Sequence, residues 1–232
     1  MMLLSFYIFS LFFNAVFSMV IPCHRPKNSS DITPFQLTLI APSTRACNIS
    51  APFTDECRTA EQAAPFINKA FDDYAISSVG EKAAILSLML FETGDFKFDR
   101  NHFPAPGRPG QGTRNLMTFP FVHQYALDTP STHSRALALA GPNATDPSIT
   151  NDTMNAVRDL VLGDELSFAS AMWFYKASGP ERAGCTANQS LADGLVAQTR
   201  QGWEDYITGC IFTSVTEDRA SVWEKTLSVL SS

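Results

Sequence analysis

The 232-residue sequence has few cysteines and no Cys-x-x-Cys pair, so it does not indicate a zinc site or a redox dithiol. It also lacks an excess of basic residues, because 17 Lys and Arg stand against 23 Asp and Glu. The resulting formal net charge of −6 argues against nucleic acids and anionic membranes as partners. Beyond the N-terminus no window is apolar enough to span a bilayer, so we expect a mature protein without a membrane segment.

Several catalytic motifs are also missing. There is no Gly-x-Ser-x-Gly elbow, which argues against an α/β-hydrolase. The run "GRPGQGTR" (107–114) lacks the Gly-Lys-Ser/Thr ending of a phosphate loop and follows no buried strand. No histidine lies at i, i+4 beside a carboxylate, so we expect neither a metal site nor a cofactor. The histidines are His24, His102, His123 and His133.

The N-terminal segment has the features of a secretory signal. Residues 1–18 are apolar and uncharged, and they end in small residues, with Val16 and Ser18 at the positions before a cleavage site. Residues 19–50 are rich in Pro, Ser and Thr, which is typical of a lead-in or propeptide. Their apolar run "FQLTLIA" (35–41) is an alternative candidate for an edge strand. We expect one folded domain over 51–232.

Two further features agree with export to an oxidising compartment. Asn-x-Ser/Thr glycosylation acceptors are dense for a chain of this length. They lie at Asn28, Asn48, Asn143, Asn151 and Asn188. For the disulfides we pair Cys47 with Cys57, and Cys185 with Cys210. Cys23 is then free, paired between chains, or removed with a propeptide. The sequence therefore predicts a secreted, extracellular and monomeric glycoprotein.

Helical patterns dominate from Thr59 onward. Thr59 with Gln62, and Ser78 with Glu81, have the spacing of capping boxes that open two helices. The first helix carries one apolar stripe at i, i+3, i+4 spacing. The second, "KAAILSLMLFE", has almost no polar face and ends at Glu92. An apolar circumference predicts burial on all sides, so this is the expected central helix.

After Glu92 the helical period is lost. Phe96 and Phe98 alternate with charged residues, as in a short half-buried strand, and a Gly- and Pro-rich loop (104–112) follows. Helical patterns then resume at 121–127, 132–140, 152–162, 165–177, 190–212 and 217–230. We expect a mainly α (α+β) architecture with a small β-ribbon and loop inserted after the buried helix.

Glu92 has an environment that suits a general acid. The helix C-terminus places partial negative charge beside it, and the last helical turn surrounds it with apolar side chains. Both effects disfavour the charged form, so the carboxyl would keep its proton near neutral pH. Asp95 and Asp99 follow as candidates for a second carboxylate, as glycoside cleavage commonly requires.

The residues after Glu92 also offer hydrogen-bonding groups for sugar hydroxyls and acetamides. These substrate-binding candidates are Asn101, His102, Gln111, Thr113, Arg114 and Asn115. Phe96, Phe98 and Phe103 are candidates either for faces that stack on sugar rings or for a small core beneath the ribbon.

The order of buried helix, Glu, short ribbon and Gly-rich loop with Gln resembles the lysozyme superfamily. That superfamily includes goose-type lysozymes, lytic transglycosylases, chitinase-like relatives and muramidase-like domains of secreted fungal proteins. "ETGDF" (92–96) and "GQGT" (110–113) resemble its catalytic pieces, and "ELSFASAMWFYKA" (165–177) resembles the helix that backs its cleft. The resemblance implies a lysozyme-like helical domain over 51–232 with Glu92 as the acid.

The implied function is a secreted glycoside hydrolase that cleaves an N-acetylated amino-sugar polymer. Peptidoglycan is the first substrate and chitin or chitosan the second, although the acidic chain does not suit an anionic cell wall. Asp95 or Asp99 would activate water or stabilise the developing positive charge, whereas a transglycosylase would use Glu92 alone. The alternative is a catalytically inactive glycan-binding or effector protein on the same fold.

Overall fold

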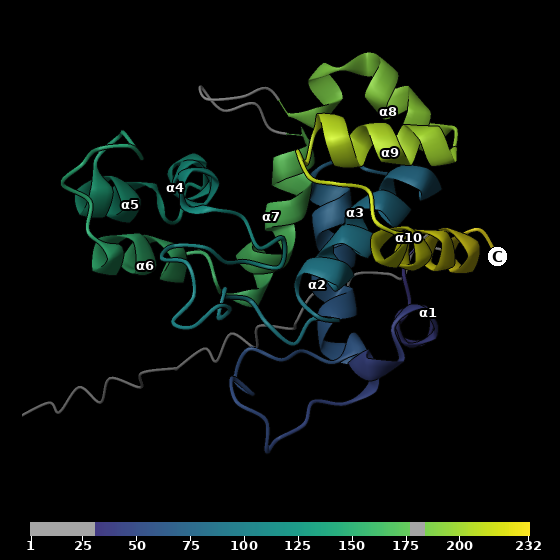
Figure 1. Ribbon diagram of the computed structural model, residues 1–232, viewed down its shortest axis with the longest axis horizontal. Helices are drawn as coiled ribbons and strands as arrows, with labels where there is room; N and C mark the ends of the chain where they lie inside the picture. Colours follow the sequence, from purple (N-terminus) through teal and green to yellow (C-terminus); the bar gives the residue numbers. More distant parts are fainter. Residues whose placement is uncertain (1–30, 177–183) are drawn as a thin grey trace, which may run out of the picture.

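The computed structural model describes residues 31–176 and 184–232, which fold into helices joined by irregular segments (Figure 1). The expected mainly α class is confirmed. The expected β-ribbon is not found in the described residues, where only isolated bridges join Arg100 with Gly112 and Gly112 with Met117. Positive φ angles at Asp95 and Phe96 turn the chain immediately after the buried helix, so the alternating pattern there does not extend into a strand.

Three helices form the centre of the molecule (Figure 1). They are α2 (Ala60–Asp73), α3 (Val79–Glu92) and α7 (Asp164–Lys176). Every residue of α3 from Gly80 to Leu90 is buried, as its apolar circumference predicts. The buried carboxylate of Glu81 accepts a hydrogen bond of 2.9 Å from the Tyr175 hydroxyl of α7. Lys176 Nζ lies 3.9 Å from the same oxygen, so this carboxylate has both a hydrogen-bond donor and a cation beside it.

The remaining helices flank this centre on two sides (Figure 1). On one side are α4 (Phe119–Asp128), α5 (His133–Ala140) and α6 (Asn151–Asp159). On the other are α1 (Pro34–Ile40), α8 (Gln189–Val196), α9 (Arg200–Gly209) and α10 (Glu217–Leu230). Short 3-10 turns, η1 (Pro42–Arg45) and η2 (Cys185–Ala187), complete the described elements. Helix α10 packs mainly against α3.

Residues 35–40 of the run 35–41 are helical and Ala41 caps the helix, so the assignment of this run as an edge strand was wrong. Thr33 and Gln36 form a capping box, and Pro34 occupies the first helical position, where its missing N–H is harmless. Leu37 is fully buried in a core shared with α2 and α10. At least this part of the Pro-, Ser- and Thr-rich segment therefore belongs to the folded unit.

Both disulfide pairings are confirmed. Cys47 and Cys57 have Cα atoms 5.9 Å apart and close the segment before α2. Cys185 and Cys210 have Cα atoms 5.4 Å apart and join η2 to the end of α9.

The signal at 1–18, Cys23 and Asn28 lie outside the described residues. The other glycosylation acceptors are exposed, namely Asn48, Asn143, Asn151 and Asn188. Their modification stays a prediction. No helix in the described ranges is long and apolar enough to cross a membrane.

Candidate functional site

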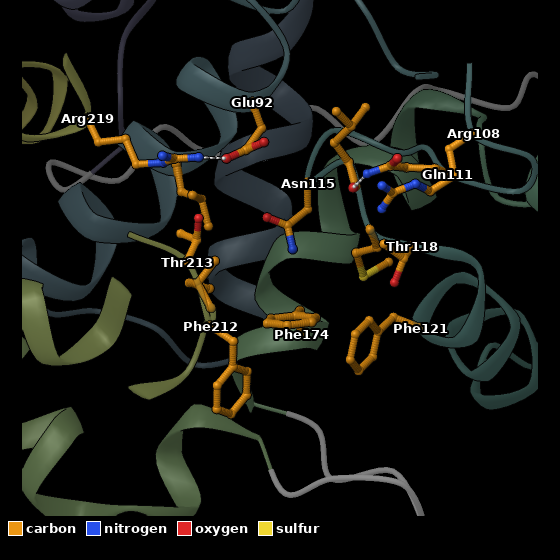
Figure 2. Close-up of a pocket in the computed structure, with 14 residues that line it drawn as sticks. Glu92, Arg108, Gln111, Asn115, Thr118, Phe121, Phe174, Phe212, Thr213 and Arg219 are labelled. Atoms are coloured by element: carbon orange, nitrogen blue, oxygen red, sulfur yellow. Dashed lines mark hydrogen bonds and ion pairs between the residues drawn. The ribbon is translucent and has the colours of Figure 1, made fainter. Parts of the chain in front are cut away.

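A cleft of about 340 Å³ lies at the C-terminal end of α3 (Figure 2). Its walls come from α3, the segment 108–118, α4, α7, the segment 211–213 and the first turn of α10. The polar lining is Glu92, Arg108, Gln111, Asn115, Thr118, Thr213 and Arg219. The apolar lining is Leu88, Leu116, Met117, Phe121, Phe174, Ile211 and Phe212.

Glu92 is paired with a cation from a distant part of the chain. Its Oε1 lies 3.1 Å from Nη2 of Arg219 on α10, and the Arg219 guanidinium lies 4.5 Å from the Phe91 ring centroid. A guanidinium stabilises an ionised carboxylate, which opposes the effect of the apolar wall. The pairing of Arg219 with Glu92 could not be predicted from local sequence patterns, because 127 residues separate the two. The Glu92 carboxylate therefore does not have the purely apolar surroundings that the sequence led us to expect.

Asn115 lies between the Glu92–Arg219 pair and the aromatic wall (Figure 2). Its Oδ1 is buried and has no hydrogen-bond partner in the described part of the chain. The backbone N–H of Arg114 donates to Ser167 O of α7 at 3.2 Å, which fixes the adjoining turn. Beside it, Gln111 Nε2 donates to Leu116 O at 2.9 Å. The Asn115 amide thus borders the cleft, while its unused acceptor oxygen is buried beneath the cleft surface.

Phenylalanine rings form the opposite wall of the cleft (Figure 2). Phe121 of α4 and Phe174 of α7 meet edge to face, with ring centroids 5.2 Å apart. Phe212 lies in the loop between α9 and α10 and leaves 73% of its surface exposed. One side of the cleft is therefore polar and the other is aromatic.

Neither candidate for a second carboxylate lines this cleft. Asp95 Oδ2 accepts a hydrogen bond from the Ser43 hydroxyl of η1, and Asp95 is absent from the cleft lining. Asp99 is buried, and Nη2 of Arg114 lies 3.9 Å from its Oδ2. Burial raises the pKa of Asp99 to about 6, although the nearby Arg114 lowers it. Glu92 is the single carboxylate in the cleft lining formed by described residues.

Two predicted substrate-binding residues have structural positions instead. The fully buried Arg114 guanidinium donates to the carbonyls of Phe96 and Phe98, each at 3.0 Å, and to Glu56 O. It lies 5.2 Å from the Phe168 ring centroid, and burial lowers its pKa to about 10. Thr113 is buried, and its hydroxyl accepts from Ser170 at 2.8 Å.

The remaining candidates divide between two places. Gln111 and Asn115 line the cleft with Glu92. Asn101 and His102 line another pocket, which also includes Arg108. His102 Nε2 lies 2.8 Å from Glu56 Oε1, and its ring stacks on Phe53 with centroids 3.5 Å apart. No group of three or more His, Cys, Asp or Glu that could hold a metal ion occurs among the described residues.

Comparison with known proteins identifies a relative of a different kind. A curated protein of Fusarium oxysporum (strain Fo5176), a bifunctional dioxygenase (DOX)-epoxy alcohol synthase (EAS), is 32% identical over 166 residues. The similarity covers 72% of this chain but 12% of that protein, so the chain spans a small part of its relative. No protein-family model matches the chain. No solved structure matches it either.

This relative overturns the interpretation as a glycoside hydrolase. Its name describes oxidative chemistry, not hydrolysis of peptidoglycan or chitin by a muramidase. The cleft also lacks, among its described lining, the pair of carboxylates that glycoside cleavage commonly uses. The roles assigned to Glu92, Asp95 and Asp99 in that reaction are therefore withdrawn. The resemblance of the fold to lysozymes stays a prediction.

Proposed function

We propose that this chain is a secreted domain that binds a small apolar molecule carrying hydroxyl or epoxide oxygens. The observation that supports it is the Asn115 amide beside a cleft with an aromatic wall, since its buried Oδ1 has no hydrogen-bond partner among the described residues. A buried acceptor without a donor is destabilising by about 1–3 kcal/mol. A ligand hydroxyl can satisfy this acceptor when the Asn115 side chain turns its Oδ1 toward the cleft, while the rings cover the apolar body of the ligand.

The other groups of the cleft fit the same class of ligand. Arg108 borders the cleft, is exposed, and has no side-chain hydrogen bond or ion pair within the described residues. Its guanidinium can only donate, so it suits an oxygen that can only accept, such as that of an epoxide. Burying hydrocarbon against Phe121 and Phe174 contributes about 25 cal/mol per Å² of apolar surface. The rings therefore supply affinity, and the polar groups supply orientation.

The Fusarium relative supports this choice of oxygenated ligand. By its name it includes an epoxy alcohol synthase, and an epoxy alcohol carries both a hydroxyl donor and an epoxide acceptor. The relative's dioxygenase and synthase activities belong to a much longer protein, of which this chain matches 12%. For this reason we propose binding of such a molecule rather than its synthesis. The two disulfides agree with secretion.

Isothermal titration calorimetry on the chain with both disulfides formed tests the proposal. The probes are an epoxy alcohol of about the length of octanol, octanol itself, and the methyl ether of octanol, which cannot donate. We expect affinity to fall in that order. The variant Asn115→Leu keeps the side-chain size but removes the amide, so it should bind the epoxy alcohol about tenfold more weakly. It should also lose the preference for octanol over the ether.

A matched pair of phenylalanine variants controls for general hydrophobic effects. Phe212 lines the cleft and is 73% exposed, whereas Phe103 is 68% exposed and does not line it. We expect Phe212→Ala to weaken binding several-fold and Phe103→Ala to leave it unchanged. Equal effects of the two variants, or no binding of any probe, would contradict the proposal.

A further inference from the structure

Another pocket, of about 330 Å³, lies between the segment 100–109 and α6. Its charged lining consists of Arg100, Arg108 and Arg158, with His102 beside them. No carboxylate contributes to this lining among the described residues. A lining whose charged side chains are all arginines is unexpected in a chain with a formal net charge of −6.

Two of the three asparagine side-chain oxygens in this lining are already in use. Asn101 Oδ1 accepts from the Arg108 backbone N–H at 2.9 Å. Asn155 Oδ1 accepts from the Gly110 N–H and from Arg158 Nη1, each at 3.0 Å. The amide NH₂ groups that remain are donors. The amides of Asn101 and Asn155 therefore offer the pocket donors rather than acceptors.

The arginines add to this surplus of donors. A guanidinium has five N–H groups, and Arg158 uses Nε, Nη1 and Nη2 in contacts with Asp159 and Asn155. Arg100 donates Nη1 to Glu56 at 2.9 Å. The Arg108 side chain makes no hydrogen bond or ion pair within the described residues. Each guanidinium thus retains N–H groups for a ligand.

Carboxylates outside the lining hold Arg100 and Arg158 in place. Arg100 is the more neutralised of the two, because Asp55, Asp99 and Asp159 also lie 3.7–3.9 Å from its guanidinium. Glu56 is 2% exposed and contacts both Arg100 and His102, at 2.9 and 2.8 Å. Asp159 Oδ1 lies 2.8 Å from Arg158 Nη2. The guanidinium groups of Arg100 and Arg158 are therefore positioned before any ligand arrives, which reduces the entropy lost on binding.

We propose that this pocket is a binding site for an oxyanion, such as a phosphate or carboxylate group. Guanidinium groups form charge-assisted hydrogen bonds with both kinds of oxyanion. Asn151, the first residue of α6, also lines the pocket and places the positive end of that helix beside it. The site is distinct from the Glu92 cleft and does not depend on the function proposed for that cleft.

Arg108 connects the two sites, because it lines the pocket and also the cleft, where Figure 2 shows it. An oxyanion that engages the Arg108 guanidinium withdraws it from a cleft ligand. By thermodynamic linkage, each ligand then weakens the other by the same factor. This coupling rests on the proposed function of the cleft, whereas the oxyanion site itself does not.

Calorimetric titration with sodium phosphate, sodium acetate and sodium chloride at matched ionic strength tests the site. The chain is made with both disulfides and without glycans, since Asn151 is a predicted glycosylation acceptor. We expect saturable binding of phosphate or acetate and none of chloride. The tighter of the two identifies the class of oxyanion. Arg108→Gln and Arg158→Gln should each weaken this binding about tenfold.

The control is Arg45→Gln, because Arg45 is exposed and lines neither pocket. It should bind the oxyanion like the wild type, and thermal unfolding checks that all three variants are folded. Absence of saturable binding to the wild type, or an equal loss in Arg45→Gln and Arg108→Gln, would overturn the site. Phosphate or acetate binding without epoxy alcohol binding would overturn the cleft proposal and leave the oxyanion site standing.

Discussion

Asp99 and Arg114 show how single residues of the segment after α3 serve the fold. Asp99 is 4% exposed, and its Oδ1 has no hydrogen-bond partner in the described part of the molecule. Arg114 Nη2 lies 3.9 Å from its other oxygen, and the carboxylate of Glu56 adds repulsion. Burial dominates these effects and raises the pKa of Asp99 from 3.8 to about 6.

This raised pKa predicts a pH dependence of stability. Between about pH 4 and pH 6 the folded state binds the Asp99 proton more tightly than the unfolded state does. The free energy of unfolding should therefore fall as the pH rises through this range, by about 3 kcal/mol at most. Asp99→Asn cannot titrate, so its stability should fall less over the same range. Urea unfolding at several pH values measures the difference, and parallel curves for the two proteins would contradict it.

The cleft residues were predictable only where the signal was local. Glu92, Gln111 and Asn115 follow one another closely, and the end of a buried helix placed them at one location. Arg219 comes from α10, and its pairing with Glu92 depends on how that helix packs against α3. The sequence predicted both Asn115 and Arg114 as substrate-binding residues because both are polar. In the structure Asn115 borders the cleft, whereas Arg114 is buried beside it.

At the scale of elements, helices with strong local signals were predicted well. Thr59 and Gln62 form the expected capping box. Ser78 caps α3, but the Glu81 side chain accepts from Tyr175 instead of completing its box, which no local pattern reveals. The single pattern over 190–212 divides into α8 and α9, because Thr199 caps a new helix. The expected β-ribbon did not form, because Arg114 donates to the carbonyls of Phe96 and Phe98, which a neighbouring strand would otherwise satisfy.

The contact between α8 and α9 depends on two glycines. A Cβ added at Gly202 would lie 2.2 Å from Gly194 O, a backbone atom that cannot easily move. Alanine normally stabilises a helix by about 1 kcal/mol relative to glycine. Here the clash should reverse the sign, so we expect Gly202→Ala to lower the stability by about 1–3 kcal/mol.

Gly209 on the same helix provides the control for this prediction. A Cβ there would meet only Leu191 Cδ1 at 3.9 Å, an ordinary contact. Gly209→Ala should therefore leave the stability unchanged or raise it slightly, as measured by guanidinium unfolding. Similar stabilities for the two alanine variants would show that α8 and α9 can separate without cost.

At the scale of the whole molecule, the cleft joins elements from both flanks of the central helices. Phe121 comes from α4 on one side, whereas Thr213 and Arg219 come from the opposite side (Figure 1). Glu92 and Phe174 come from the centre between them. The sequence order of helix, Glu and Gly-rich loop indicated where a site would lie. The chemistry of the cleft depends on contacts between distant segments, which the sequence order of helix, Glu and loop does not reveal.

The Cys185–Cys210 disulfide anchors one wall of this composite cleft. Cys210 ends α9 and directly precedes Ile211, Phe212 and Thr213, which line the cleft. Cys47 and Cys57 line no part of it. In the chain-entropy account, loops of these lengths stabilise the folded state by about 3 kcal/mol each. Replacing either pair with serine should therefore lower the midpoint of guanidinium unfolding.

The two pairs should differ in their effect on ligand binding. Without the Cys185–Cys210 bond, the 211–213 segment loses its anchor, and epoxy alcohol affinity should fall about tenfold under conditions where the variant remains folded. Without the Cys47–Cys57 bond, the affinity should stay at the wild-type value despite the lower stability. Calorimetry on both variants makes the comparison. An equal loss of affinity in the two would mean that cleft geometry follows overall stability rather than the anchored segment.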